Sequence, residues 1–248
     1  MQSLLGDGKN HILLQLFLHM GSLAALFYCC NNLIVRLSRA QKLASVPKRR
    51  RKRPLDTHSL MDIRFLRTAV IPVVIAFFFY DQVSVLEENL VAISVFLLLN
   101  GIILYIPQFL PGSNKDSRSL SPVDILIFGL GGALSIIPGL SCVGTAVSIA
   151  TVRGTDKKFA LDAALMLSIA VVIGFIAMDI LTVVSVGLAG VKFVQVLQYL
   201  FCGICSFFGT MLGVKILKTL IEEQGISVFA YYSWTIALFT FIFYLTAA

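Results

Sequence analysis

The ten residues Ile136–Thr145, with the sequence IIPGLSCVGT, decide the fold of this chain. They combine a Pro-Gly turn with hydroxyl and thiol side chains, although the residues on both sides are apolar enough for a membrane interior. Val123–Ile137 offers 15 residues before the turn and Ser141–Ala150 is shorter still, whereas a helix needs about 20 residues to cross a membrane. We therefore expect residues 122–152 to form a re-entrant helix-turn-helix with its tip near Pro138.

The polar groups at this tip predict an anion site. A broken helix is tolerated at membrane depth only where its backbone is buried in protein or lines a wet cavity. The second half begins at the tip, so the positive end of its dipole suits a phosphate. We therefore take Gly139, Ser141, Gly144 and Thr145 as candidate phosphate-binding residues, with Ser141 as the candidate catalytic hydroxyl. The alternative for Ser141 and Thr145 is that they only cap the helix.

The composition predicts an all-α integral membrane protein. Of the 248 residues, 58% are hydrophobic and 13% are charged, against roughly 25% charged in soluble domains. Residues 1–248 are expected to form a single membrane domain with six transmembrane helices. The six apolar runs are His11–Val35, Leu66–Tyr80 with its flank, Leu90–Ile106, Phe159–Val186, Phe193–Leu217 and Val228–Leu245.

The basic residues predict the orientation. Residues 36–67 contain 11 of the 20 Lys and Arg residues, including KRRRKR at Lys48–Arg53, and basic loops stay cytoplasmic. We therefore expect this loop inside, the N-terminus outside, and no nucleic-acid partner despite the net charge of +7. A hairpin that returns over residues 122–152 places 18 basic residues inside, whereas a single crossing places 14, so re-entry is favoured.

Three spans precede the hairpin and three follow it, which predicts two inverted three-helix halves. The first repeat, residues 8–107, lacks a hairpin of its own, and residues 153–248 complete the second repeat. Asp162 and Asp179 lie near the two ends of one span, where solvation is the favoured interpretation, and His19 is interpreted as a hydrogen-bonded packing residue. The five cysteines and three scattered histidines suggest no metal cluster, so we expect no bound metal of that kind.

Five stretches in order resemble the undecaprenyl-pyrophosphate phosphatase family, also called BacA or UppP. That family's loop P-G-x-S-R-S-G-A-T is matched at Pro138, Gly139, Ser141 and Gly144, with Thr145 one place early. The other stretches begin as LHMGSLAAL at Leu18, TAVIPVVI at Thr68, RGTDKKFALDAALMLSI at Arg153 and GISVFAYYSW at Gly225.

The resemblance implies a lipid-carrier phosphatase of the bacterial plasma membrane. Such a protein removes the terminal phosphate of undecaprenyl pyrophosphate, so that the carrier is reused in cell-wall (peptidoglycan) synthesis. Polyprenyl pyrophosphate or phosphate would be the lipid partner, and a divalent cation is the one cofactor that the resemblance allows. Several negatively charged oxygens would have to be held, neutralised and attacked in line.

Two departures from the family pattern predict weak or no hydrolysis. The acidic first-repeat motif E-G-x-T-E-F-L-P-x-S-S-T-G-H is not found in these 248 residues, and Cys142 and Val143 stand where the loop has Arg and Ser. Cys offers no fixed positive charge to a phosphate. The alternatives are a transporter or flippase for polyprenyl phosphate or another anion, and a non-catalytic subunit of a complete homologue. A homodimer or hetero-oligomer would then supply the missing hairpin.

Overall fold

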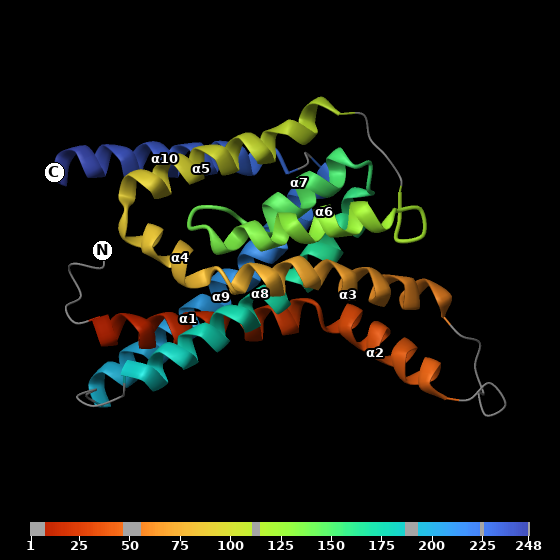
Figure 1. Ribbon diagram of the computed structural model, residues 1–248, viewed down its shortest axis with the longest axis horizontal. Coiled ribbons are helices and arrows are strands. Elements are labelled where there is room, and N and C mark those ends of the chain that lie inside the picture. Colours follow the sequence, from red (N-terminus) through yellow and green to blue (C-terminus); the bar gives the residue numbers. More distant parts are fainter. Residues whose placement is uncertain (1–7, 47–55, 111–114, 187–192, 224–225, 248) are drawn as a thin grey trace.

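The computed structural model describes residues 8–46, 56–110, 115–186, 193–223 and 226–247, which form helices and their connections (Figure 1). Short 3-10 turns extend α4, α5 and α6. The α-helices are α1 (Gly8–Cys29), α2 (Asn31–Ser45), α3 (Thr57–Phe77), α4 (Tyr80–Ser84), α5 (Leu90–Tyr105), α6 (Pro122–Ala133), α7 (Cys142–Val152), α8 (Lys157–Val186), α9 (Phe193–Glu223) and α10 (Val228–Ala247).

Five of the described helices are long and apolar enough to cross a membrane, and a bent pair provides a sixth. The bent pair joins α3 to the segment Tyr80–Glu87 at an angle of 64°. The five straight candidates are Ile12–Cys29, Leu90–Phe109, Lys157–Ser185, Val194–Ile221 and Val228–Thr246. The predicted all-α membrane fold is therefore confirmed, whereas the inverted relation of its two halves, and the boundaries of the two repeats, stay predictions.

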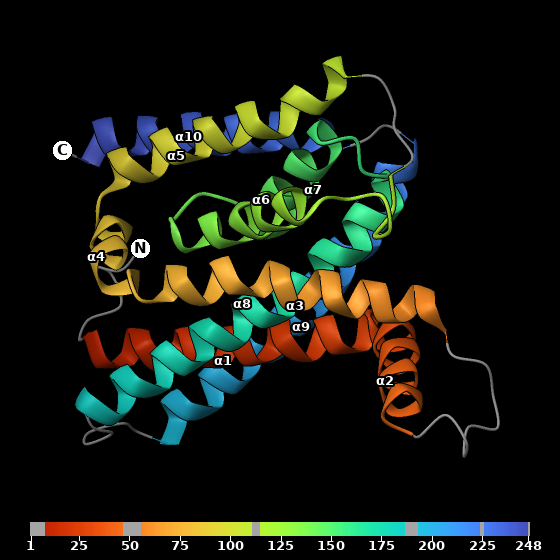
Figure 2. The ribbon, with the colours of Figure 1, turned by 45° about the vertical axis from the view of Figure 1, so that its right-hand side comes forward.

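The first apolar run does not form one helix. We expected His11–Val35 to cross as a unit, but α1 ends at Cys29 and α2 begins at Asn31 and turns away from the bundle (Figure 2). Leu37 of α2 is buried against the protein, while basic side chains occupy its exposed face. The described part of residues 36–67, which we expected as a loop, is thus mostly helical, because it holds the rest of α2 and the start of α3.

The helices pack in three levels (Figure 2). At one side, α5 and α10 run together, and at the other α1 packs against α8 and α9. The α6–α7 hairpin lies between them, where it contacts α3, α8 and α5. Close approach depends on glycine: a Cβ at Gly129 of α6 would lie 2.3 Å from the carbonyl oxygen of Ala69 in α3. The hairpin therefore packs against several helices that could span a membrane, while one face of α6, with Val123 and Leu130, stays exposed.

The hairpin begins and ends at the same end of the molecule. The Lys115 N–H donates to the Gly154 carbonyl at 3.2 Å, and the Asp156 N–H donates to the Lys115 carbonyl at 2.9 Å. These bonds join the residues before α6 to those after α7. At 12 and 11 residues, α6 and α7 are about 18 and 16 Å long, well short of a hydrocarbon layer. The chain therefore turns back near Pro138, as the sequence predicts.

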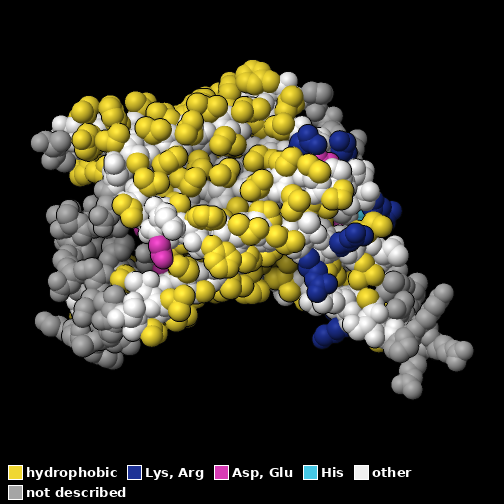
Figure 3. All heavy atoms as spheres, viewed as in Figure 1, with side chains coloured by type: hydrophobic (Ala, Val, Ile, Leu, Met, Phe, Trp, Pro, Cys, Tyr) yellow, Lys and Arg dark blue, Asp and Glu magenta, His cyan; other side chains and the backbone are white. Residues whose placement is uncertain are grey.

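Figure 3 shows one face of the molecule covered by apolar side chains across its middle, with Lys and Arg gathered at the right-hand end. Many large apolar residues are exposed, among them Phe78, Val184 and Phe239, at 69–79%. A soluble monomer rarely exposes such a continuous apolar surface, so this one is suited to lipid. The basic end holds α2 and the start of α3; which side of the membrane it faces stays a prediction.

Candidate functional site

The tip of the hairpin is built by a glycine turn and a serine cap. Gly139 has φ of +97°, in the left-handed region that favours glycine, and a Cβ there would lie 3.1 Å from the carbonyl oxygen of Ile93. Ser141 then caps α7, since its Oγ accepts a hydrogen bond of 3.1 Å from the Gly144 N–H. The turn therefore presses against α5 while the first backbone N–H groups of α7 point into the tip region.

Thr145 closes the hairpin from inside. Its Oγ1 lies 2.5 Å from the Gly131 carbonyl oxygen and 2.6 Å from that of Ser141, and its side chain is fully buried. Its hydroxyl is thus engaged with the backbone of both arms. Of the four residues predicted for phosphate binding, Thr145 has the geometry of a structural residue.

A buried amide joins the tip to α5 and α10. Asn100 Oδ1 accepts a bond of 3.0 Å from the Ser141 N–H, and its Nδ2 donates to Ser233 Oγ, also at 3.0 Å. Ser233 in turn donates to the Leu97 carbonyl at 2.8 Å. Asn100 and Ser233 are only 5% and 2% exposed. Sequence analysis missed both, although a lone Asn in an apolar helix is a signal for such a role.

A cavity of about 340 Å³ lies beside this network, between the hairpin tip and the helices α5, α9 and α10. Apolar side chains predominate, and none of the described residues that line it is acidic, basic or a histidine. The lining is Leu97, Asn100, Leu104, Gly139, Leu140, Ser141, Val143, Gly144, Gly213, Leu217, Ile226, Phe229, Tyr232 and Ser233. The cavity can therefore offer hydroxyl, amide and backbone groups to a ligand, together with an apolar wall.

Comparison with known proteins identifies the family of this chain. The sequence model of the family described as "Bacitracin resistance protein BacA" matches residues 1–239. The chain belongs to the BacA family. The undecaprenyl-diphosphatase of Methanobrevibacter smithii is 28% identical over 240 residues, which cover 94% of this chain and 84% of that protein. That of Alkaliphilus metalliredigens is 25% identical over 246 residues, covering 98% and 88%.

Three of the four predicted phosphate-binding residues of this BacA-family chain line the cavity: Gly139, Ser141 and Gly144. Cys142, the neighbour of Ser141, is absent from the lining. It lies on the side of α6, because a Cβ at Gly132 would be 3.7 Å from its Sγ.

The base of the hairpin carries an ion pair between Arg153 and Asp124. Arg153 contacts Asp124 through both Nε, at 2.5 Å, and Nη2. Burial alone would raise the pKa of Asp124, but hydrogen bonds from Ser121 and the Arg153 guanidinium outweigh it and hold that pKa below its ordinary value. Arg153 is therefore committed to the base and is not available to a ligand at the tip.

A second polar pair joins α1 to α8, with Asp179 buried and His19 partly exposed. His19 Nδ1 lies 2.7 Å from Asp179 Oδ2, and the imidazole stacks on Phe175 with ring centroids 5.2 Å apart. The interpretation of Asp179 as solvated is wrong, since it is 4% exposed, whereas Asp162 is exposed as expected. The prediction that His19 is a hydrogen-bonded packing residue is confirmed. Neither member of the pair lines the cavity.

The described part of the chain contains no group of three or more His, Cys, Asp or Glu residues arranged to hold a metal ion. Its five cysteines are all free thiols. We take the hairpin-tip cavity as the candidate functional site, because three of the predicted site residues line it and it combines hydroxyl, amide and backbone groups with apolar walls.

Proposed function

We propose that this chain binds the headgroup of polyprenyl pyrophosphate or phosphate at the hairpin tip and acts in lipid-carrier recycling. Membership of the BacA family and the name undecaprenyl-diphosphatase of its relatives support the substrate class. The observation that carries the proposal is the cavity, because it combines a helix N-terminus with apolar walls on three candidate membrane spans.

Within the cavity, the headgroup binds at the start of α7. Ser141 still has a proton to donate, because its Oγ only accepts from the Gly144 N–H. The positive end of the α7 dipole favours an anion at the same place. The isoprenoid chain lies against Leu217, Phe229 and Tyr232, lining residues from α9 and α10, of which Tyr232 is exposed at the surface.

We propose that hydrolysis at this site is weak. A pyrophosphate in its transition state needs positive charge or fixed donors, and losing one such donor lowers turnover about 10²–10³-fold. None of the described lining residues is basic. Binding therefore persists while turnover is slow.

The test measures binding and phosphate release separately on the purified full-length chain. We expect undecaprenyl phosphate to bind wild type, Ser141→Ala to weaken binding, and phosphate release from undecaprenyl pyrophosphate to be at least about 100-fold below that of a complete relative. Ser168→Ala is the matched control, since Ser168 bonds within α8 away from the cavity. Release equal to that of the relative would refute weak turnover, and equal binding by both variants would refute the placement of the headgroup.

The uncharged cavity also favours a second candidate function, transfer of a phosphorylated polyprenyl lipid without hydrolysis. Such transfer needs a binding site but no stabilised transition state. Flipping of a fluorescent polyprenyl phosphate in vesicles tests it, and a rate equal to that of empty vesicles would remove this candidate. Co-purification with a complete homologue would instead support the role of a non-catalytic subunit.

We propose further that the basic end of the bundle faces the cytoplasm and the N-terminus lies outside. The gathering of Lys and Arg at one end supports this orientation (Figure 3). In a cysteine-free variant, Ser119→Cys at the basic end should resist a membrane-impermeant thiol reagent in intact cells, whereas Gln82→Cys at the opposite end should react. The reverse pattern would overturn the orientation.

A further inference from the structure

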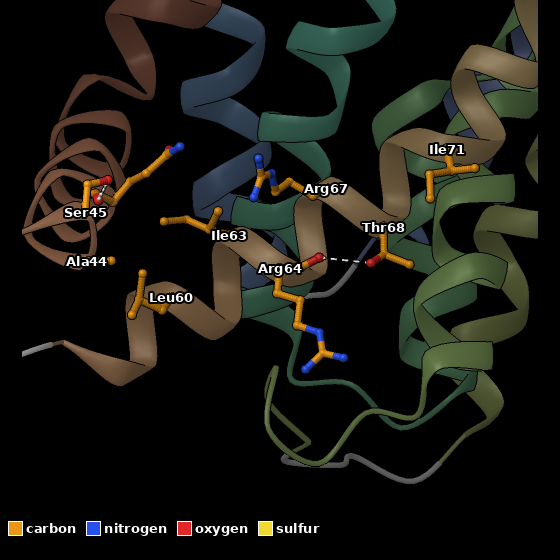
Figure 4. Close-up of a pocket in the computed structure, with 9 residues that line it drawn as sticks. Ala44, Ser45, Leu60, Ile63, Arg64, Arg67, Thr68 and Ile71 are labelled. Atoms are coloured by element: carbon orange, nitrogen blue, oxygen red, sulfur yellow. Dashed lines mark hydrogen bonds between the residues drawn. The ribbon is translucent and has the colours of Figure 1, made fainter.

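A large groove lies between α2 and α3, apart from the hairpin-tip cavity (Figure 4). Its volume is about 620 Å³, and none of its residues lines the cavity at the tip. Figure 4 shows Ala44 and Ser45 of α2 opposite Leu60 of α3. The lining is Gln41, Ala44, Ser45, Leu60, Ile63, Arg64, Arg67, Thr68 and Ile71.

The groove carries positive charge that no described acid neutralises. Arg64 and Arg67 are exposed, and neither forms a salt bridge with the acidic side chains that the structure describes. No carboxylate is among the lining residues. The nearest acid along α3, Asp62, is buried on another face, where it accepts from Arg36 at 3.0 Å and Ser117 at 2.7 Å. The two guanidinium groups point apart in Figure 4, and because both side chains are exposed, a change of rotamer can turn them toward a shared anion.

Polarity changes along the groove in the direction of the membrane. Gln41 and Ser45 lie at its polar end, and the two Arg residues follow. Ile71 comes two turns, or about 10 Å, beyond Arg64. Ile71, Val74 and Ile75 are each about half exposed, at 52–53%, and lie where α3 enters its apolar half. The groove thus offers a charged surface followed by an apolar one, which matches the headgroup and the acyl chain of a phospholipid in turn.

The amphipathic helix α2 strengthens this assignment. Its buried Leu37 and Ala40 face the protein, while Arg39 and Lys42 are exposed. A helix of this kind lies in the plane of the headgroups. Its position places the groove at the boundary between water and hydrocarbon.

We propose that the α2–α3 groove binds an anionic glycerophospholipid of the surrounding membrane. Arg64 and Arg67 hold the phosphate, and one acyl chain lies along Ile71. Charge complementarity selects an anionic lipid over a zwitterionic one, because a zwitterionic headgroup brings its own cation to the two guanidinium groups. The site is distinct from the proposed carrier-lipid site and does not depend on it.

The test is native mass spectrometry of the purified full-length chain titrated with phosphatidylglycerol or phosphatidylcholine. We expect wild type to retain phosphatidylglycerol preferentially. Arg64→Gln/Arg67→Gln should weaken that binding about 25-fold, at about fivefold for each charge lost. Arg118→Gln/Lys215→Gln is the matched control, because it removes two exposed charges outside the groove.

Three results would overturn the proposal: equal retention of both lipids, no loss in the Arg64/Arg67 variant, or an equal loss in the control. Arg64→Lys/Arg67→Lys guards against misfolding, since it keeps both charges and should retain most of the binding. If this Lys variant unfolds at the same temperature as wild type but loses as much lipid as the Gln variant, recognition by charge is refuted.

Discussion

Replacing Asn100 by Ala separates the hairpin tip from the α5–α10 pair. The change removes the acceptor of the Ser141 N–H and the donor to Ser233, both at 3.0 Å in a site that is 5% exposed. Hydrogen bonds between membrane helices contribute about 0.6 kcal/mol on average and up to about 1.7. Two such bonds therefore give an expected destabilisation of about 1–3 kcal/mol.

Unfolding of the purified chain in mixed detergent micelles with increasing SDS measures this free energy. Asn32→Ala is the control, because Asn32 is exposed at the start of α2 and its loss should change stability by less than about 0.5 kcal/mol. An Asn100→Ala value no larger than that of Asn32→Ala would refute the role of the amide.

The same variant separates stability from binding. Loss of the bond to Ser141 frees the start of α7, so undecaprenyl phosphate should bind more weakly to Asn100→Ala even where the protein is folded. Isothermal titration below the unfolding transition tests this. Unchanged affinity would mean that the amide holds helices together without positioning the proposed headgroup site.

Three further predictions concern other parts of the fold. Gly139→Ala should destabilise by about 1–2 kcal/mol in the same SDS titration, because φ is +97° and the added Cβ meets α5, whereas Gly209→Ala has open space and should not. Because the pKa of Asp124 is lowered in the folded protein, its carboxylate stabilises the fold at neutral pH, and that stabilisation is lost as the pH falls below about 4. Thermal unfolding measured from pH 3 to 7 should show this loss, and Asp124→Asn should remove the pH dependence. His19→Leu should destabilise by about 3–5 kcal/mol by leaving Asp179 buried without its partner, and a smaller loss in the double variant His19→Leu/Asp179→Leu would confirm that cause.

The hairpin could be predicted from sequence because its signals are local. Pro138 and Gly139 interrupt an apolar run, and the arms on either side are too short to span a membrane. The capping of α7 by Ser141 was likewise one of the two interpretations that the sequence offered.

The polar pairs could not be predicted, because their members are far apart in the chain. Asn100 and Ser233 are separated by 133 residues, and His19 and Asp179 by 160. Each looks like an isolated polar residue until the packing of two helices brings it to its partner. The break between α1 and α2 was missed for another reason: hydropathy continues to Val35, and only the direction of the chain changes.

The hairpin is secured unequally at its two ends. Its base is fixed by backbone bonds between Lys115 and Gly154 and by the pair of Asp124 with Arg153, whereas a single side chain, Asn100, ties the opposite end to α5. Motion that accompanies the arrival or departure of a lipid would therefore be a swing of the tip about the fixed base. Exchange would then proceed while the base of the hairpin stays closed, so that water and ions do not follow the lipid through the bundle.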